Sequence, residues 1–313
     1  MRVVYLGTPQ FAVPTLERLA ESRHQVVAVY TQPDRPKGRG QQLALSPVKE
    51  AALRLNLPMY QPPRIRRPEV IEELAGFQAD AMVIVGYGQI IPQAILDLPP
   101  FGIINVHASL LPAYRGAAPI QWAIANGEMR TGVTTMRIDA GLDTGDMLGK
   151  VETDIGPEET APELGARLAI LGADLLMNTL DLIESGAVRP EPQDGTQATY
   201  APILKKEDGH IDWELPATAI YNRVRGFNPW PGAFTTFRGQ VLHIWQAKPD
   251  IGICLGRPGS LHFINRTLHA ACGQDSALEL IEVQLEGRKR VNADAFANGQ
   301  RLTETDILGD MKN

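Results

Sequence analysis

An asparagine and a histidine stand two residues apart, at Asn105 and His107, in the segment FGIINVHASLLPAYRG. They close a short apolar run that is typical of a β-strand, so the alternation of a strand places both side chains on one face. An amide donor beside an imidazole suits a reaction in which an oxygen gains negative charge and a proton moves. The pair equally suits a structural task, because Asn and His side chains at strand ends often satisfy the backbone groups of loops.

A cluster of acids follows in DAGLDTGD, Asp139 to Asp146, between two further strand candidates. One interpretation is an Asx-rich turn without chemistry. A calcium loop is the other, but such loops alternate their ligands more tightly and close with a glutamate, which is missing here. We therefore predict no metal site.

Short apolar runs alternate with helical patterns through the first 185 residues. This alternation predicts a Rossmann-like α/β fold, a mostly parallel sheet with helices on both faces. Ligands bind at the carboxyl ends of the strands in such a sheet, where Asn105 and His107 stand. The expected strands are Arg2–Leu6, Gln25–Tyr30, Asp80–Val85, Gly102–His107, Thr131–Ile138 and Asp146–Val151, and the expected helices are Gln10–Glu21, Pro47–Asn56, Pro68–Ala75, Ala117–Ala125 and Ala161–Glu184.

The chain becomes polar and rich in proline after Gly186, and this composition is typical of a linker. Beyond it, one helix and several short strands about ten residues apart predict a small β-barrel or sandwich. We expect three parts: a catalytic domain over 1–186, a linker over 187–206 and a carboxy-terminal domain over 207–313.

Composition narrows the class of protein. Two cysteines without ligand spacing exclude a disulfide framework and suit a reducing cytosol, and no stretch has the length that a bilayer span needs. We expect a cytoplasmic protein with no membrane partner. The net charge is −6, yet Thr31 to Arg67 holds eight basic side chains against two acids. Such a basic patch can bind a polyanion, or it can be a solvated surface loop.

A nicotinamide enzyme is not expected, although a strand and turn open the chain. The dinucleotide fingerprint needs several glycines around the pyrophosphate, and RVVYLGTPQ supplies only Gly7. Pro9 also removes a backbone donor from that turn.

Several motifs together resemble the folate-dependent formyltransferase family. Asn105-x-His107, Ser-Leu-Leu-Pro at 109–112, Arg115-Gly116 and Asp143-Thr-Gly are similar to the signature of these transformylases. TQPDRPKGRG (31–40), GAAPIQWAI (116–124) and VRGFNPWPGAFT (224–235) resemble the members that act on methionyl-tRNA. The resemblance implies transfer of the formyl group of 10-formyltetrahydrofolate to the amino group of methionyl-initiator-tRNA. The alternative is another 10-formyltetrahydrofolate-dependent formyltransferase or hydrolase, such as one acting on a sugar nucleotide.

The resemblance also implies roles for individual residues. Asn105, His107 and Asp143 match the catalytic trio, and Asp143 would orient a charged imidazole. The folate would contact Ser109, Leu110, Leu111 and Pro112, and, through the stretch GYGQII, also Gln89, Ile90 and Ile91. The carboxy-terminal domain is expected to be an oligonucleotide-binding-like barrel for tRNA.

The transfer itself needs no protein nucleophile, metal or nucleotide, because an unprotonated amine can attack the formyl carbon directly. The partners that the resemblance implies are initiator methionyl-tRNA and the folate, and we expect the protein to be a monomer. Arg35, Lys37 and Arg39, in a segment (Thr31–Leu43) for which prolines and glycines predict neither helix nor strand, are assigned to the tRNA, together with Lys205 and Lys206.

Overall fold

The structure is a computed structural model that describes residues 1–37, 42–264, 266–303 and 305–309. The chain forms two compact units, each assembled from three separate stretches. Unit 1 comprises Met1–Pro119, Arg130–Asp154 and Gly165–Ala201, and unit 2 comprises Ile120–Met129, Ile155–Leu164 and Pro202–Asn313. The expected domain boundaries stay a prediction, because this division rests on contacts within the whole chain and not on the folding of a separate piece.

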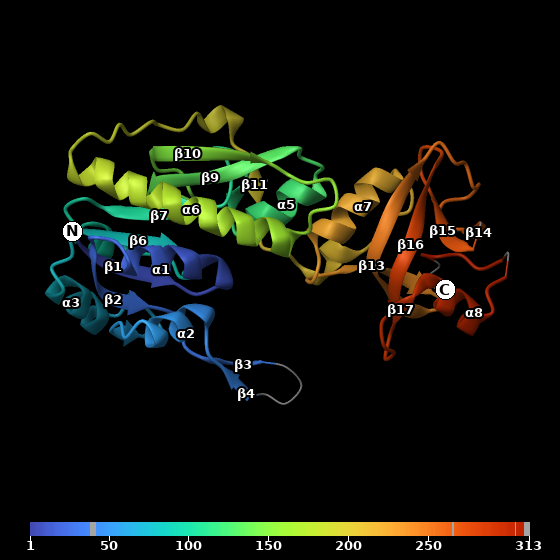
Figure 1. Cartoon of the computed structure of the whole chain (residues 1–313), viewed down its shortest axis with the longest axis horizontal. Helices are drawn as coiled ribbons and strands as arrows, with labels where there is room; N and C mark the ends of the chain where they lie inside the picture. Colours follow the sequence, from blue (N-terminus) through green and yellow to red (C-terminus); the bar gives the residue numbers. More distant parts are fainter. Residues whose placement is uncertain (38–41, 265, 304, 310–313) are drawn as a thin grey trace. The chain divides into compact units, whose positions relative to one another are not determined.

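Seven of the described strands form the sheet of unit 1, in the order β10-β9-β7-β6-β1-β2-β5 (Figure 1). Five of them run parallel, whereas β9 is antiparallel to β7 and β10 is antiparallel to β9. The predicted mostly parallel, Rossmann-like sheet is confirmed, with antiparallel pairing at one edge. The strands are β1 (Arg2–Gly7), β2 (Gln25–Tyr30), β5 (Met59–Tyr60), β6 (Ala81–Val85), β7 (Ile103–His107), β9 (Arg130–Arg137) and β10 (Met147–Asp154).

Helices cover both faces of this sheet, because each central strand is apolar on both sides. Ile103 of β7 belongs to a buried cluster that also contains side chains of α3 and α4. Val106 points to the opposite face, where Gly172 of α6 packs so closely that an added Cβ would lie 2.8 Å from a Val106 methyl. The helices on this sheet are η1 (Gln10–Ala12), α1 (Val13–Ala20), α2 (Pro47–Arg54), α3 (Pro68–Gly76), α4 (Gln93–Leu96) and α6 (Ala161–Glu184), of which residues 161–164 belong to unit 2.

The basic segment after β2 contains a hairpin, so the prediction of neither helix nor strand for Thr31–Leu43 is wrong. β3 (Arg35–Lys37) pairs with β4 (Gln42–Ala44) in an antiparallel ribbon. Both strands of a two-stranded ribbon are edge strands, where a proline such as Pro36 is tolerated without loss of a ladder. Arg39 lies outside the described residues.

Unit 2 is built on an antiparallel sheet in the order β12-β13-β16-β15-β14, with β17 added at β16. The segment after α8 closes this sheet. Leu308 donates its N–H to Gly259 (2.8 Å), and Gly309 donates to Thr236 (2.9 Å), which links the two edges. The predicted small barrel is thus confirmed as a closed antiparallel sheet. Its elements are α7 (Ala217–Gly226), β12 (Ala233–Phe237), β13 (Gln240–Ile251), β14 (Leu261–Ile264), β15 (Thr267–Cys272), β16 (Ser276–Leu285), β17 (Val291–Asn292) and α8 (Ala293–Gln300), together with η3 (Lys206–Gly209) and most of α5 (Pro119–Ala125).

The polar stretch after α6 makes backbone contacts within unit 1. Met147 and Glu191 exchange two hydrogen bonds of 2.9 and 2.8 Å. Beyond η2 (Gly195–Gln197), β11 (Tyr200–Ala201) pairs in parallel with β8 (Arg115–Gly116). The stretch therefore lies along the loops that carry Arg115 and Asp143. No helix within the described part of the chain is long and apolar enough to cross a membrane.

Candidate active site

Asn105 and His107 end β7, and the loop between β9 and β10 brings Asp143 to them. Both strand residues are buried, at 9% and 6% exposure, and alternation puts them on one face. Oδ2 of Asp143 lies 3.7 Å from Nδ1 of His107, at ion-pair distance when the imidazole is protonated. The structure therefore brings together a histidine and a carboxylate that are far apart in the sequence.

The two ring nitrogens of His107 have different partners. Nε2 lies 2.9 Å from the carbonyl oxygen of Tyr114. A carbonyl oxygen only accepts, so Nε2 carries a hydrogen in this arrangement. Nδ1 is then the nitrogen that faces Asp143.

Asp143 has an unusual backbone and a firmly held carboxylate. Its φ is 53°, in the left-handed region that Asp tolerates better than most residues. Oδ2 accepts the N–H of Gly116 at 2.8 Å. Close packing also fixes Gly145, where an added Cβ would lie 1.9 Å from the carbonyl oxygen of Arg137. The carboxylate thus points toward His107 from a loop with little freedom.

Gln193 is a residue that the sequence reasoning missed. Its Nε2 donates to the carbonyl oxygens of Asp143 (2.8 Å) and Gly145 (2.7 Å). Its Oε1 accepts from Nε and Nη2 of the buried Arg115, at 3.1 and 2.8 Å. Gln193 stands in a polar, proline-rich stretch without periodicity, directly after Pro192, so the sequence carries no local signal that marks it.

The loop expected to contact the folate begins directly after His107. Ser109 is buried, and its Oγ donates to the carbonyl oxygen of Ala113 at 2.6 Å. Leu111 is buried with Met136 and Met147. Leu110 and Pro112 are half-exposed. Ser109 and Leu111 therefore hold the loop in shape, and a ligand could meet the other two side chains or the backbone.

The second expected folate stretch follows β6, the strand beside β7. Gln89 accepts the N–H of Ile65 (2.7 Å), Ile90 is 91% exposed, and Ile91 is half-buried. The carbonyl oxygen of Tyr87 accepts from the side chains of Thr8 and Gln32, both at 3.1 Å. Burial raises the pKa of the Tyr87 phenol to about 12. The hydrogen bonds to the Tyr87 carbonyl oxygen connect the ends of β1, β2 and β6 at the same sheet edge as the trio.

The basic residues expected to contact tRNA are placed in part. The backbones of Arg35 and Lys37 lie in β3, which follows β2 and so leaves the sheet at its carboxyl edge. Lys205 and Lys206 are exposed in unit 2, at the start of η3. The carboxylate of Asp208 accepts the N–H of Lys205 at 2.6 Å.

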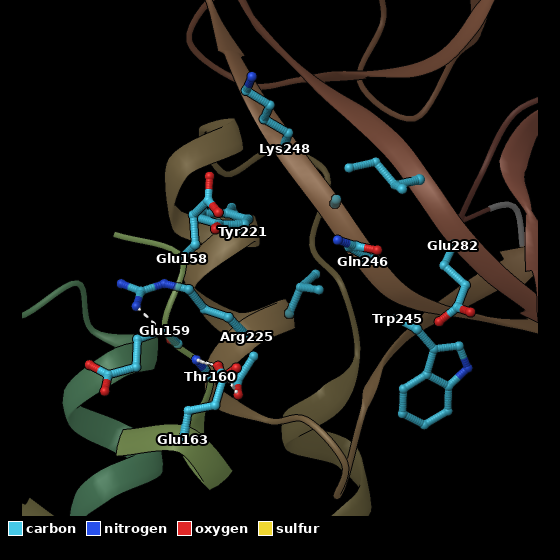
Figure 2. A pocket seen from close by; sticks show the side chains of 13 residues that line it. Glu158, Glu159, Thr160, Glu163, Tyr221, Arg225, Trp245, Gln246, Lys248 and Glu282 are labelled. Atoms are coloured by element: carbon cyan, nitrogen blue, oxygen red, sulfur yellow. Dashed lines mark hydrogen bonds between the residues drawn. The ribbon is translucent and has the colours of Figure 1, made fainter. Parts of the chain in front are cut away.

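Unit 2 contains a cavity of about 720 Å³, shown in Figure 2. Several of its charged groups already have partners within the unit. Glu163 accepts from Thr160, and the guanidinium of Arg225 donates to the carbonyl oxygens of Gly156 and Glu159. The lining of this cavity includes none of the trio and none of the expected folate residues, so the candidate active site stays with unit 1.

Comparisons with known proteins identify the family of this chain. Residues 1–180 match the family described as Formyl transferase, and residues 203–301 match Formyl transferase, C-terminal domain. The fold and the site therefore define a formyl transferase. A methionyl-tRNA formyltransferase of Solibacter usitatus (strain Ellin6076) is 66% identical over 310 residues, which cover 99% of this chain and 99% of that protein. The chain belongs to the methionyl-tRNA formyltransferase family.

Solved structures show the same fold at lower sequence identity. Methionyl-tRNA formyltransferase from Clostridium thermocellum matches with a TM-score of 0.54 and 18% identity, over 79% of this chain and 93% of that one. HypX from Aquifex aeolicus in complex with tetrahydrofolic acid matches with a TM-score of 0.63 and 18% identity, over 95% of this chain and 47% of that chain. A folate complex is thus found among the structural neighbours.

Proposed function

We propose that this protein transfers the formyl group of 10-formyltetrahydrofolate to the free amino group of methionyl-initiator-tRNA, giving N-formylmethionyl-tRNA for translation initiation. The observation that carries the proposal is the approach of the Asp143 carboxylate to Nδ1 of His107, 3.7 Å away, on the face that Asn105 shares. The full-length relative of 66% identity supports the choice of acceptor.

The chemistry is an acyl transfer. The amine nitrogen bonds to the formyl carbon, and the bond between that carbon and N10 of the folate breaks. One proton leaves the amine, and N10 receives one. The carboxamide of Asn105 donates to the formyl oxygen while that oxygen carries negative charge.

His107 and Asp143 handle charge and protons in this scheme. Since Nε2–H of His107 is donated to Tyr114, only Nδ1–H can serve the reacting groups, and it does so when the ring is protonated. Asp143 pairs with that ring and, directly or through a water, accepts the proton of the attacking amine. The N–H of Gly116 keeps the carboxylate in place.

The donor and the acceptor are assigned to different sets of residues. The loop 109–112 and the stretch 89–91 border the folate, because they follow the adjacent strands β7 and β6. Arg35, Lys37 and Arg39, with Lys205 and Lys206, contact phosphates of the tRNA. The protein acts as a monomer in the cytoplasm and uses no metal, since acyl transfer to an amine needs none.

The test is a formylation assay with a choice of acceptors. The protein is incubated with 10-formyltetrahydrofolate and methionyl-tRNA, and formyl-methionine is released by mild base and quantified. A parallel reaction contains an amino-sugar nucleotide, and a third contains no acceptor. Product in the first reaction alone is the expected result. Formyl transfer to the sugar, or hydrolysis of the donor at the same rate without an acceptor, would replace the proposed function with one of those activities.

A further inference from the structure

We infer that Gln193 is a positioning residue that sets the Asp143 loop for catalysis, a role that rests on the proposed function. The side chain uses its whole carboxamide at once. Nε2 bridges the carbonyl oxygens of Asp143 and Gly145, and Oε1 accepts two hydrogen bonds from the Arg115 guanidinium. One residue thereby joins both loops that meet at the trio.

The two carbonyl oxygens explain why a glutamine is needed. They lie 2.8 and 2.7 Å from the same nitrogen, so both N–H groups of the carboxamide are used. A carboxylate at this place could still accept from Arg115 but would put negative charge beside two acceptor oxygens. Only a side chain that donates at one end and accepts at the other satisfies all three partners.

The strained backbone of Asp143 explains what Gln193 holds. A φ of 53° is sparsely populated by residues other than glycine, and such strain persists only where surrounding contacts enforce it. Gln193 binds the carbonyl oxygens of that residue and of Gly145, two residues on. Its own place is fixed by the backbone pair of Glu191 with Met147. The anchor is thus a ladder contact, not another flexible side chain.

Arg115 completes the connection to His107. Its backbone N–H donates to Thr199 (2.8 Å), and the next residue, Gly116, donates to the Asp143 carboxylate. The preceding residue, Tyr114, supplies the carbonyl oxygen that binds Nε2 of His107. Holding Arg115 and the Asp143 loop at a fixed separation therefore also holds Asp143 at its distance from His107.

The test compares Gln193→Glu and Gln193→Ala with the same changes at Gln197. Gln197 is exposed in the same stretch, and its side chain donates a hydrogen bond to the carboxylate of Asp194. We expect the Gln193 variants to lower kcat by about 10- to 100-fold, with KM for methionyl-tRNA and for 10-formyltetrahydrofolate changed less than about threefold. The Gln197 variants should stay within about twofold of the unchanged protein.

Two further measurements separate positioning from general stability. Backbone amide exchange at Gly116 should speed up in Gln193→Glu, because its acceptor, the Asp143 carboxylate, loses its fixed position. In the Asp143→Asn background, the Gln193→Ala change should have little further effect on kcat, since residues that act through one another are not additive. Full multiplicative loss in the double variant, or a raised KM with unchanged kcat, would overturn the inference. If the unchanged protein did not formylate methionyl-tRNA, the proposed function would fail instead, while the exchange result at Gly116 would still decide whether Gln193 positions Asp143.

Discussion

His107 shows how a single ring divides two tasks between its nitrogens. Nε2 is committed to the carbonyl oxygen of Tyr114, and Nδ1 faces Asp143. The ring cannot rotate freely without losing the first contact, so the fold fixes which nitrogen faces Asp143. Asn105 stands on the same strand face, and its amide adds a donor that stays neutral at any pH.

The trio should respond to substitution as a catalytic group. Asn105→Ala, His107→Ala and Asp143→Asn are each expected to lower turnover by about a hundredfold or more, because each removes a contact that the proposed mechanism makes to the reacting atoms. Folate affinity should change little. Single-turnover formylation with saturating tRNA measures the effect, and Asp154→Asn, at the other end of β10, serves as the charge-matched control. An Asp143→Asn protein that kept most of its turnover would remove that carboxylate from the mechanism.

Sequence reasoning reached some of these residues and not others, for physical reasons. Strand alternation predicts that Asn105 and His107 share a face, because that relation is local. The resemblance to formyltransferases pointed to Asp143. Nothing local marks Gln193, since its partners are separated from it by about 50 residues or more and hydrogen bonds of this kind leave no periodic pattern.

At the scale of elements, the packing of α6 on β7 depends on the absence of a side chain at Gly172. An added Cβ would lie 2.8 Å from Val106 and 3.2 Å from Val133, both β-branched and stiff. The helix therefore lies closer to the sheet than an alanine would permit.

Gly172→Ala should therefore destabilise the protein, although alanine normally favours a helix. We expect the free energy of unfolding to fall by about 1–3 kcal/mol through overpacking. The control is Gly76→Ala at the end of α3, where an added Cβ meets nothing within 4 Å. That change should be neutral or stabilising by about 0.5–1 kcal/mol. Urea denaturation measures both, and equal effects of the two changes would contradict the close packing of α6.

A buried carboxylate, that of Asp306, adds to the closure of the barrel in unit 2. Asp306 accepts from Arg238 at 2.7 and 2.6 Å and from the N–H of Thr303 at 2.8 Å. The hydrogen bonds from Arg238 are the main reason why the pKa of Asp306 is lowered to about 2. The carboxylate thus ties the closing segment to β12 and its turn.

This low pKa predicts an acid-sensitive barrel. The carboxyl of Asp306 contributes its stability fully above the ordinary aspartate pKa near 4, and the contribution is lost as the pH falls toward 2. Asp306→Asn should cost about 1–2 kcal/mol at pH 7, allowing for solvent screening of the half-exposed Arg238. The variant should lose less stability than the unchanged protein between pH 4 and pH 2. Denaturant titrations across that range test it, and parallel pH curves for the two proteins would be the contrary result.

The elements themselves were largely predictable, and the exceptions follow from their surroundings. Long apolar or amphipathic runs gave β1, β2, β6, β7 and α6 within a residue or two. The hairpin β3–β4 was not predicted, because the prolines and glycines of Thr31–Leu43 disfavour a strand locally. Pairing across the ribbon outweighs that preference. The backbone pairing of Glu191 and of β11 was not predicted, because strands of one or two residues have no periodicity.

At the scale of the whole molecule, charge is distributed unevenly along the chain. The net charge is −6, yet the basic patch over Thr31 to Arg67 begins directly after β2, at the sheet edge that carries the trio. A polyanion would therefore be attracted to a limited region of an acidic body.

Replacing Arg35, Lys37 and Arg39 with alanine should weaken methionyl-tRNA binding and flatten its salt dependence. Each lost phosphate contact is expected to reduce the slope of log affinity against log salt by about 0.7–0.9. Folate affinity should not change. A control triple, Lys150→Ala, Arg189→Ala and Arg257→Ala, removes the same charge from exposed positions elsewhere. Equal slopes for the two triple variants would mean that this segment is a solvated hairpin that does not contact the tRNA.

Unit 2 is assembled from stretches that are far apart in the sequence, and this has a consequence for the nascent chain. The ring of Trp122 packs 5.3 Å from that of Phe227, and Gly226 fits against Ala125 within unit 2. Residues 120–129 leave the ribosome long before their partners do, and at about 5–20 residues per second the interval is roughly 5–20 s. During that time the apolar side of α5 has no cover from α7. Each copy therefore passes through a stage in which a chaperone has an exposed helix to bind, and slowing the translation of residues 130–226 should lengthen that stage in proportion.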